Sequence, residues 1–239
     1  DIISSKGFYR DNMLQGNGII YNKEGVIYYE GEFKDDLPNG LGKFYNEFGR
    51  LAFEGELRNG NPNGFGKLYG KETKSLYYEG EFVNGNYNGT GKIYYPNGSL
   101  QYEGQFKDGL YDGQGKLYYL ENGKLEYDGQ FKNSKFNGIG KHYYSNGTLQ
   151  FTGTFINDLR EGYGKKFKEN GEPYGEGYYK NDRLHGKGKL WYDNGSLMYE
   201  GDLFEGRMEG YGKQFYKTNG NLQYEGEYIN NAANGRGKA

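Results

Sequence analysis

Histidine is the side chain that most often serves in metal binding and acid–base chemistry near neutral pH, and this chain has two, His142 and His185. They occupy different positions of a repeated unit. His142 stands where other copies have an apolar residue, such as Ile93 or Leu117, and His185 directly precedes Gly186. Because cysteine is also absent, the sequence predicts no metal site and no catalytic triad.

The motif Gly-x-Gly could in principle cradle a phosphate group. A phosphate-binding glycine loop requires a helix directly after it, and a P-loop also requires GxxxxGK[ST]. Here the motif recurs ten times, each copy runs into alternating apolar and polar residues, and no P-loop sequence occurs. Repetition on this scale indicates a structural role, so we expect no nucleotide and no other cofactor.

Carboxylates are numerous, but they recur as a column through the repeats. General acid–base catalysis needs two carboxyl groups that converge at one place, and no single repeat departs from the column in that way. The sequence therefore predicts a protein that is not an enzyme. An enzyme acting on glycans through tyrosine stacking and carboxylates is the catalytic alternative.

The residues that could do chemistry are thus part of a repeat with a period of 24 or 25 residues. Its first landmark is the glycine of Tyr-Glu-Gly, found at Gly7, Gly31, Gly55, Gly80, Gly104, Gly129, Gly153, Gly177, Gly201 and Gly226. The second landmark, Gly-x-Gly, always begins nine residues later. The variable connection is one residue longer around Lys74, Gly123 and Gly220. We expect the connection of fixed length to be built into a stack and the other to project.

Within each repeat apolar and polar residues alternate, as in the segment 51–57, which is typical of half-buried strands. Asn-Gly pairs such as Asn97-Gly98 and Asn146-Gly147 are strong signals for two-residue hairpin turns, because both residues tolerate positive φ. Each repeat is therefore predicted to be a β-hairpin. The predicted fold is all-β: residues 1–239 form one continuous array of about ten stacked hairpins, an elongated, twisted, single antiparallel sheet with open ends, similar to a solenoid.

Glycine weakens a strand, so its regular presence needs a reason. Aromatic residues recur beside it: the column two residues before the first landmark is aromatic in eight of ten repeats, as at Tyr29, Phe53 and Tyr78, and is broken by Ser5 and Gly175. We expect each ring to lie flat across a glycine of the neighbouring strand, which would give a thin core without a second layer.

The opposite face carries glutamates such as Glu30 and Glu54 and lysines such as Lys43 and Lys67, predicted to be cross-strand neighbours that fix the register. Because side chains alternate between the two faces of a strand, the aromatic column that includes Tyr45, two residues after Lys43, should lie on this charged face. Either that column is exposed, or the strand twists or bulges there. An exposed aromatic column flanked by charges would be a protein-binding surface. The candidate protein-binding residues are Tyr45, Tyr69, Tyr94, Tyr118, Tyr143, Phe167, Trp191 and Phe215.

The eighth repeat departs most from the others. It contains Pro173, Gly175 and His185, together with Trp191, the only tryptophan. These repeat-breaking residues are a second candidate site, and a local kink is the alternative interpretation.

The composition limits the partners. Thirty basic and 32 acidic residues are interspersed and give a net charge of −2, so nucleic acid is not expected and lipid or membrane binding has no support from charge. Aromatic residues make up 18% of the chain, which excludes a disordered low-complexity chain. Open strand edges at both ends predict end-to-end self-association. The chain starts at Asp1; if this is a processed start, a bacterial cell envelope or secreted location is expected rather than the cytoplasm.

The unit Tyr-Glu-Gly-Glu-Phe-x-x-Gly-x-x-x-Gly-x-Gly-Lys resembles the MORN repeat, from about Lys6 to Lys238. With Asn-Gly-x-Leu and a period of 24 residues it looks like the bacterial, antitoxin-type variant of that repeat. In the eukaryotic form a histidine precedes Gly-x-Gly, which only His185 matches here. The resemblance implies a non-enzymatic scaffold for protein–protein interaction. An antitoxin or immunity protein that neutralises a toxin, and a secreted or envelope-associated adhesin, are the alternatives.

Overall fold

A computed structural model describes residues 2–238, so Asp1 and Ala239, at the ends of the predicted array, lie outside the described residues. The chain divides into two compact units, residues 1–123 and 124–239. Each is described separately below. Every regular element of the described residues is a strand, which confirms the all-β fold class. A single continuous array as the domain organisation stays a prediction.

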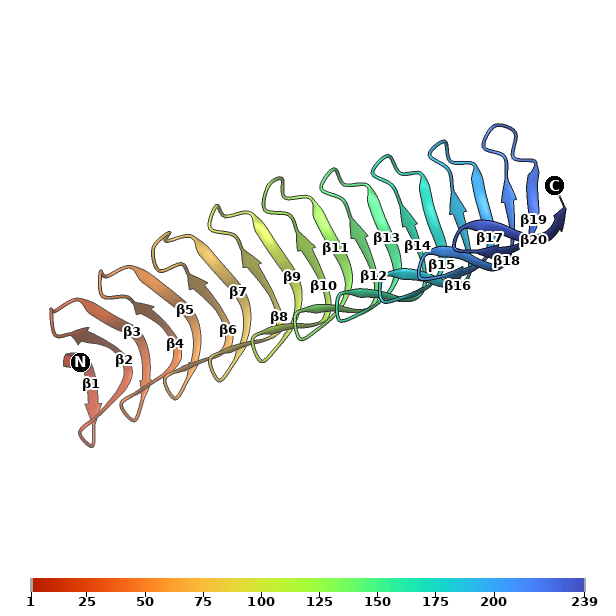
Figure 1. Ribbon diagram of the computed structural model, residues 1–239. Coiled ribbons are helices and arrows are strands. Elements are labelled where there is room, and N and C mark those ends of the chain that lie inside the picture. Colours follow the sequence, from red (N-terminus) through yellow and green to blue (C-terminus); the bar gives the residue numbers. More distant parts are fainter. Residues whose placement is uncertain (1, 239) are drawn as a thin grey trace. The chain divides into compact units, whose positions relative to one another are not determined.

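The first unit contains ten strands in five antiparallel hairpins (Figure 1). They are β1 (Ile2–Arg10), β2 (Met13–Asn22), β3 (Ile27–Lys34), β4 (Leu37–Tyr45), β5 (Leu51–Arg58), β6 (Asn61–Tyr69), β7 (Leu76–Val83), β8 (Asn86–Tyr94), β9 (Leu100–Lys107) and β10 (Leu110–Tyr118). Within this unit, strands that follow one another in the chain pair antiparallel, from β1 with β2 to β9 with β10.

The second unit repeats this arrangement with its own ten strands. They are β11 (Leu125–Lys132), β12 (Lys135–Tyr143), β13 (Leu149–Ile156), β14 (Leu159–Phe167), β15 (Pro173–Lys180), β16 (Arg183–Trp191), β17 (Leu197–Phe204), β18 (Arg207–Phe215), β19 (Leu222–Ile229) and β20 (Ala232–Lys238). All of the pairings recorded between its neighbouring strands are antiparallel.

The two-residue hairpin turns are not at the predicted Asn-Gly pairs such as Asn97-Gly98 and Asn146-Gly147, so that prediction is wrong. The two-residue turns lie in the connection of fixed length, as at Asp35-Asp36 and Asn59-Gly60, where both residues have positive φ, as a type I′ turn requires. Asn97-Gly98 instead lies in a five-residue loop, 95–99, and only its glycine has positive φ. The loop is closed because Asn97 Oδ1 accepts the Ser99 N–H at 2.9 Å, an Asx turn.

The two-residue turns are tied to the preceding hairpin. The Gly60 N–H donates to the Pro38 carbonyl oxygen at 2.8 Å, and the Gly85 N–H donates to that of Pro62 at 2.8 Å. The opposite connections vary from four residues, at 23–26, to six, at 70–75, 119–124 and 216–221. The fixed connection is therefore built into the stack, as expected from its constant length.

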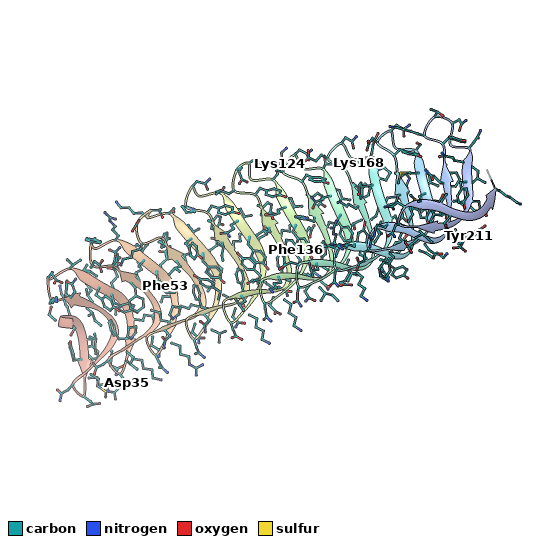
Figure 2. The ribbon with its side chains drawn as sticks, in the orientation of Figure 1. Asp35, Phe53, Lys124, Phe136, Lys168 and Tyr211 are labelled. Carbon is teal, nitrogen blue, oxygen red and sulfur yellow. The ribbon has the colours of Figure 1, made fainter. Side chains whose placement is uncertain are left out.

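Rings packed on glycines form the core of both units. Tyr29, Tyr78, Tyr127 and Tyr199 are fully buried. The Tyr78 hydroxyl oxygen lies 2.5 Å from the place where a Cβ on Gly91 would stand, so only glycine leaves room for the ring. Phe53 and Phe136, labelled in Figure 2, belong to the ring face of the first and second unit, respectively. The expected packing of rings on glycines is confirmed.

Partner rings complete this layer. Tyr78 stacks on Tyr87 with centroids 4.0 Å apart, and Tyr127 stacks on Phe136 at 3.8 Å. Edge-to-face contacts at about 5 Å join successive hairpins, as between Tyr78 and Phe106. Such pairs contribute about 0.5–1.5 kcal/mol beyond the burial of their area, so a single layer of strands obtains a core from its own rings.

Candidate functional site

On the face opposite the rings, the paired glycines form a channel without side chains. Gly31 pairs with Gly42, and Gly42 pairs with Gly55, across strands β3, β4 and β5. One side of the channel is the row of glutamates and lysines, because Glu30 and Lys43 are themselves partners in this register. The other side carries the residues between the glycines of Gly-x-Gly. The glycines thus serve the ring layer on one face and a groove on the other.

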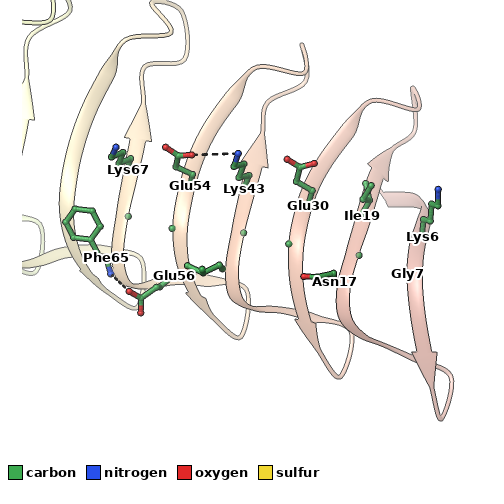
Figure 3. Close-up of a pocket in the computed structure, with 16 residues that line it drawn as sticks. Lys6, Gly7, Asn17, Ile19, Glu30, Lys43, Glu54, Glu56, Phe65 and Lys67 are labelled. Atoms are coloured by element: carbon green, nitrogen blue, oxygen red, sulfur yellow. Dashed lines mark hydrogen bonds and ion pairs between the residues drawn. The ribbon is translucent and has the colours of Figure 1, made fainter.

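In the first unit this groove has a volume of about 830 Å³, within the range of ligand pockets. Figure 3 shows Lys6, Glu30, Lys43, Glu54 and Lys67 along one side of the glycines and Asn17, Glu56 and Phe65 along the other. Three large apolar side chains line it. Ile19 is half-buried, whereas Leu41 retains 62% and Phe65 50% of its accessible surface.

A bulge presents these apolar residues. The register shifts between Gly31 and Phe33, so Glu32 faces extra residues of β4. Glu32 Oε1 accepts the Leu41 N–H at 3.0 Å, and Glu56 Oε1 accepts the Phe65 N–H at 3.3 Å. The carboxylate thus satisfies a donor that the strand ladder leaves over at the bulge.

The charged row pairs across strands as predicted. In the first unit Lys43 Nζ lies 4.0 Å from a Glu54 carboxylate oxygen, and in the second Lys189 Nζ lies 3.4 Å from Glu200. These side chains are partly exposed, so each pair contributes at most about 1 kcal/mol. Their main effect is to leave both signs of charge along the groove.

The groove of the second unit differs in its lining. Its volume is about 480 Å³, and it is bounded by Tyr163, Glu176, Lys187, Lys189 and Tyr211, among others. The position between the two glycines is occupied along the first groove by Asn17, Leu41 and Phe65, and here by Tyr163, Lys187 and Tyr211.

Hydrogen bonds hold both tyrosines at carboxylates. The Tyr163 hydroxyl donates to Glu176 at 2.6 Å, and the Tyr211 hydroxyl donates to Glu225 at 3.0 Å. The bond to Glu176 raises the pKa of Tyr163, and the same bond lowers the pKa of Glu176. At neutral pH the tyrosine is therefore the donor and the carboxylate the acceptor.

The eight candidate ring residues lie at the end of every second strand from β4 to β18, and none of them lines either groove. All of them are half-buried. The strand shifts register between Phe44 and Tyr45, so the alternative of a bulge applies and the column is not fully exposed. The Tyr45 hydroxyl donates to Glu30 at 2.5 Å, and burial, followed by this hydrogen bond, raises the pKa of Tyr45 to about 12.

The same bond recurs at Tyr69, Tyr94 and Tyr118, each of which donates to a glutamate at 2.6–2.7 Å. In the second unit Lys165 Nζ lies 5.6 Å from the ring centres of both Phe167 and Trp191, a cation–π arrangement. The structure thus brings two of the candidate residues together around one lysine. Protein binding by the column stays a prediction.

The repeat-breaking residues lie in one hairpin. Pro173 begins β15 opposite Phe167, and Gly175 pairs with Leu190. The His185 ring lies 5.0 Å from that of Phe204. His142 is in a different hairpin, on β12, and burial lowers its pKa. Nowhere in residues 2–238 do three or more metal-ligating side chains gather at one place.

Sequence reasoning missed Leu41, Phe65, Tyr163 and Tyr211, the residues between the paired glycines. The available signal was the presence of a large side chain at a position that is small or polar in other copies, such as Asn17. Within residues 2–238 no helix is long and apolar enough to cross a membrane.

A family model described as MORN repeat matches the chain nine times. The matched residues are 29–46, 53–72, 78–100, 102–120, 127–149, 151–172, 176–197, 199–220 and 224–239. Among curated proteins, none matches the chain.

Proposed function

Since this chain belongs to the MORN repeat family, we propose that it is a non-enzymatic scaffold that binds a protein segment in the groove of its first unit. The observation that carries the proposal is the pair Leu41 and Phe65, two exposed apolar side chains beside a floor of glycine backbone. Apolar anchors in a concave site, surrounded by polar groups, are the usual centre of binding energy in protein interfaces.

The geometry sets the form of the partner. Leu41 and Phe65 lie on β4 and β6, two strands apart, so their backbones are about 10 Å apart at the usual strand spacing. A segment with two apolar side chains at that separation would contact both. The charged row offers alternating partners such as Lys43 and Glu54, which favours a segment that carries both signs of charge.

The repetition of the charged groups along the grooves favours binding over catalysis as the main role. Their carboxylates and lysines recur as cross-strand pairs from hairpin to hairpin, whereas a reaction centre needs a few groups that differ from their neighbours and converge. We therefore propose binding without a reaction.

The test is selection of displayed random peptides on the full chain, followed by affinity measurement with synthetic peptides. We expect the double variant Leu41→Ser/Phe65→Ser to weaken binding roughly tenfold or more, as loss of central anchors does. Phe48→Ser is the matched control, because Phe48 is an exposed phenylalanine of the same unit that does not line the groove. Equal binding by the double variant and the wild type would refute the proposal.

Two narrower roles specify the partner further: an antitoxin that neutralises a toxin, and an envelope-associated adhesin. Both rest on the sequence resemblance and the composition. A toxin gene beside the gene for this chain would support the first, and an export signal in the full gene would support the second.

A further inference from the structure

The groove of the second unit is lined by tyrosine rings where that of the first unit has aliphatic and phenyl side chains. Tyr163 retains 54% of its accessible surface and Tyr211 47%, and both border the groove. Tyr178 retains 58%, and its ring stands edge-on to that of Tyr163, with centroids 5.6 Å apart. Exposed tyrosine rings provide flat apolar surface together with a polar edge.

These rings are fixed in place before any ligand arrives. Tyr163 donates to Glu176 and Tyr211 to Glu225. The two carboxylates are held in turn by lysines, Lys165 at 3.3 Å and Lys213 at 3.4 Å. Side chains that are already ordered lose little conformational entropy on binding.

Charge in this groove is matched internally. Besides the two pairs above, Lys187 Nζ lies 2.8 Å from Asp202 and Lys189 Nζ lies 3.4 Å from Glu200. A charged ligand would meet no unmatched charge of opposite sign. A neutral ligand rich in hydroxyl groups would find acceptors in the carboxylates and donors in the lysines.

In the eighth hairpin one backbone N–H beside the groove, that of Lys187, has no side-chain acceptor. In six hairpins a side chain accepts the N–H of the residue between the glycines, as Glu32 does for Leu41 and Asp202 does for Tyr211. In β15 Tyr178 stands where those hairpins carry the acceptor, and among residues 2–238 no side chain accepts the Lys187 N–H. A ligand oxygen can take this bond.

We propose that the groove of the second unit binds a neutral oligosaccharide. The C–H face of a sugar ring is apolar and packs on a tyrosine ring, while its hydroxyls bond the carboxylates, the lysines and the Lys187 N–H. Tyr163 on β14 and Tyr211 on β18 are four strands apart, about 19 Å at the usual strand spacing. Contact with both therefore requires a chain of several sugars. This site is independent of the protein-binding groove proposed for the first unit.

The experiment titrates the full chain with neutral hexasaccharides of glucose, xylose, mannose and N-acetylglucosamine, each in separate runs. Trp191 is the only tryptophan, and it lies beside Lys165, which binds the groove carboxylate Glu176, so its fluorescence reports on the site. We expect a saturable change in fluorescence with at least one hexasaccharide, confirmed by calorimetry, and a weaker response to the corresponding monosaccharide.

The variants assign the binding to the rings. Tyr163→Ala/Tyr211→Ala should weaken it roughly tenfold or more, because two stacking surfaces are lost. Tyr163→Phe should retain most of it, since the ring remains. Tyr216→Ala is the matched control, an exposed tyrosine of the same unit that does not line the groove.

Three outcomes overturn the proposal: no hexasaccharide binds, binding is unchanged in the double variant, or the site takes selected peptides and no sugar. The Leu41→Ser/Phe65→Ser test of the first unit is unaffected by any of them, so failure of one proposal is distinguishable from failure of the other.

Discussion

The hairpin β7–β8 in the first unit and the hairpin β15–β16 in the second cover the same glycine positions in two ways. In β7–β8 the Tyr78 ring lies over Gly91, and its hydroxyl donates to the Glu81 carbonyl at 2.8 Å. In β15–β16 Gly175 stands in the tyrosine position, and a Cβ added there would lie 2.9 Å from Leu184 Cδ1. Leu184 also lies 3.3 Å from the place of a Cβ on Gly177, and Leu203 of β17 lies 2.8 Å from that of Gly188, the counterpart of Gly91. Leucines of neighbouring strands thus cover the glycines where the tyrosine is missing.

The two hairpins also differ on the groove face. Glu81 accepts both the N–H and the hydroxyl of Thr90, at 2.9 and 2.8 Å, whereas the eighth hairpin has Tyr178 in place of the carboxylate. In the hairpin β7–β8 the residue at this position, Glu81, stabilises the bulge by accepting hydrogen bonds. In the hairpin β15–β16 the residue at this position, Tyr178, presents an exposed ring instead. The repeat that lacks the core tyrosine is thus also the one that exposes Tyr178 against the groove residue Tyr163.

The largest effect is expected from removal of the regular cover. Tyr78 is fully buried, so Tyr78→Ala should lower the free energy of unfolding by about 3–5 kcal/mol, and Leu184→Ala by about 2–5 kcal/mol. Urea denaturation measures both changes. Tyr77→Ala is the control, since Tyr77 is the exposed neighbour and should cost within about 0.5 kcal/mol. A cost for Tyr78→Ala no greater than that of the control would show that the ring is not a cover.

A smaller effect is expected when the irregular hairpin is given the regular cover. Gly175→Tyr places a ring where Leu184 already lies, and such overpacking should cost about 1–3 kcal/mol. In the Leu184→Ala background the new ring has room, so the cost should fall and the two substitutions should couple by about 0.5–3 kcal/mol. A double-mutant cycle measures this coupling. Simple additivity would mean that the leucine does not replace the tyrosine.

The smallest effect concerns the bulge. The hydrogen bonds from Thr90 lower the pKa of Glu81, so its stabilising contribution is present above the usual glutamate pKa and is lost as the pH falls through the lowered value. Glu81 is largely exposed to solvent, so Glu81→Ala should cost below about 1 kcal/mol at neutral pH. The cost should disappear in acid.

Glu81→Gln separates the two parts of that effect. Gln105 Oε1 accepts the Gln114 N–H at 2.8 Å, so an amide oxygen is sufficient at this position. The variant should keep the stability of the wild type at neutral pH and lack the acid dependence. Urea denaturation at neutral and acidic pH measures both, and an unchanged acid dependence in Glu81→Gln would contradict the assignment.

Much of the fold could be predicted because it depends on local pattern. The alternation of apolar and polar residues predicted the strands, and the rings spaced to cover strand glycines, as Tyr29 covers Gly42, predicted the core. The turns were misassigned because Asn-Gly satisfies two geometries. In the loop 95–99 the Asn97 side chain closes an Asx turn. The type I′ turns also contain other residues, such as Asp35 and Asp36, whose positive φ could not be predicted from the residue types.

The grooves could not be predicted, because they depend on contacts between strands. Nothing near Leu41 in the sequence shows that Glu32, nine residues before it, bonds its N–H and turns it beside a glycine floor. The compensation at Gly175 is likewise invisible without its neighbour Leu184. The bonds of the candidate column to carboxylates, such as that of Tyr45 to Glu30, depend on a register shift that strand parity could not predict.

Pairing of each strand with its neighbours in the chain has a consequence for how the units fold. Contacts such as Tyr78 with Tyr87 and Gly80 with Gly91 join residues close in sequence, so little chain must be ordered before a contact forms. Folding rates rise as the mean sequence separation of contacts falls, and most all-β proteins fold slowly because their strands pair over long separations. Each unit here is expected to nucleate at any one hairpin and to grow by adding the next, so it should fold faster than a β-sandwich of the same length.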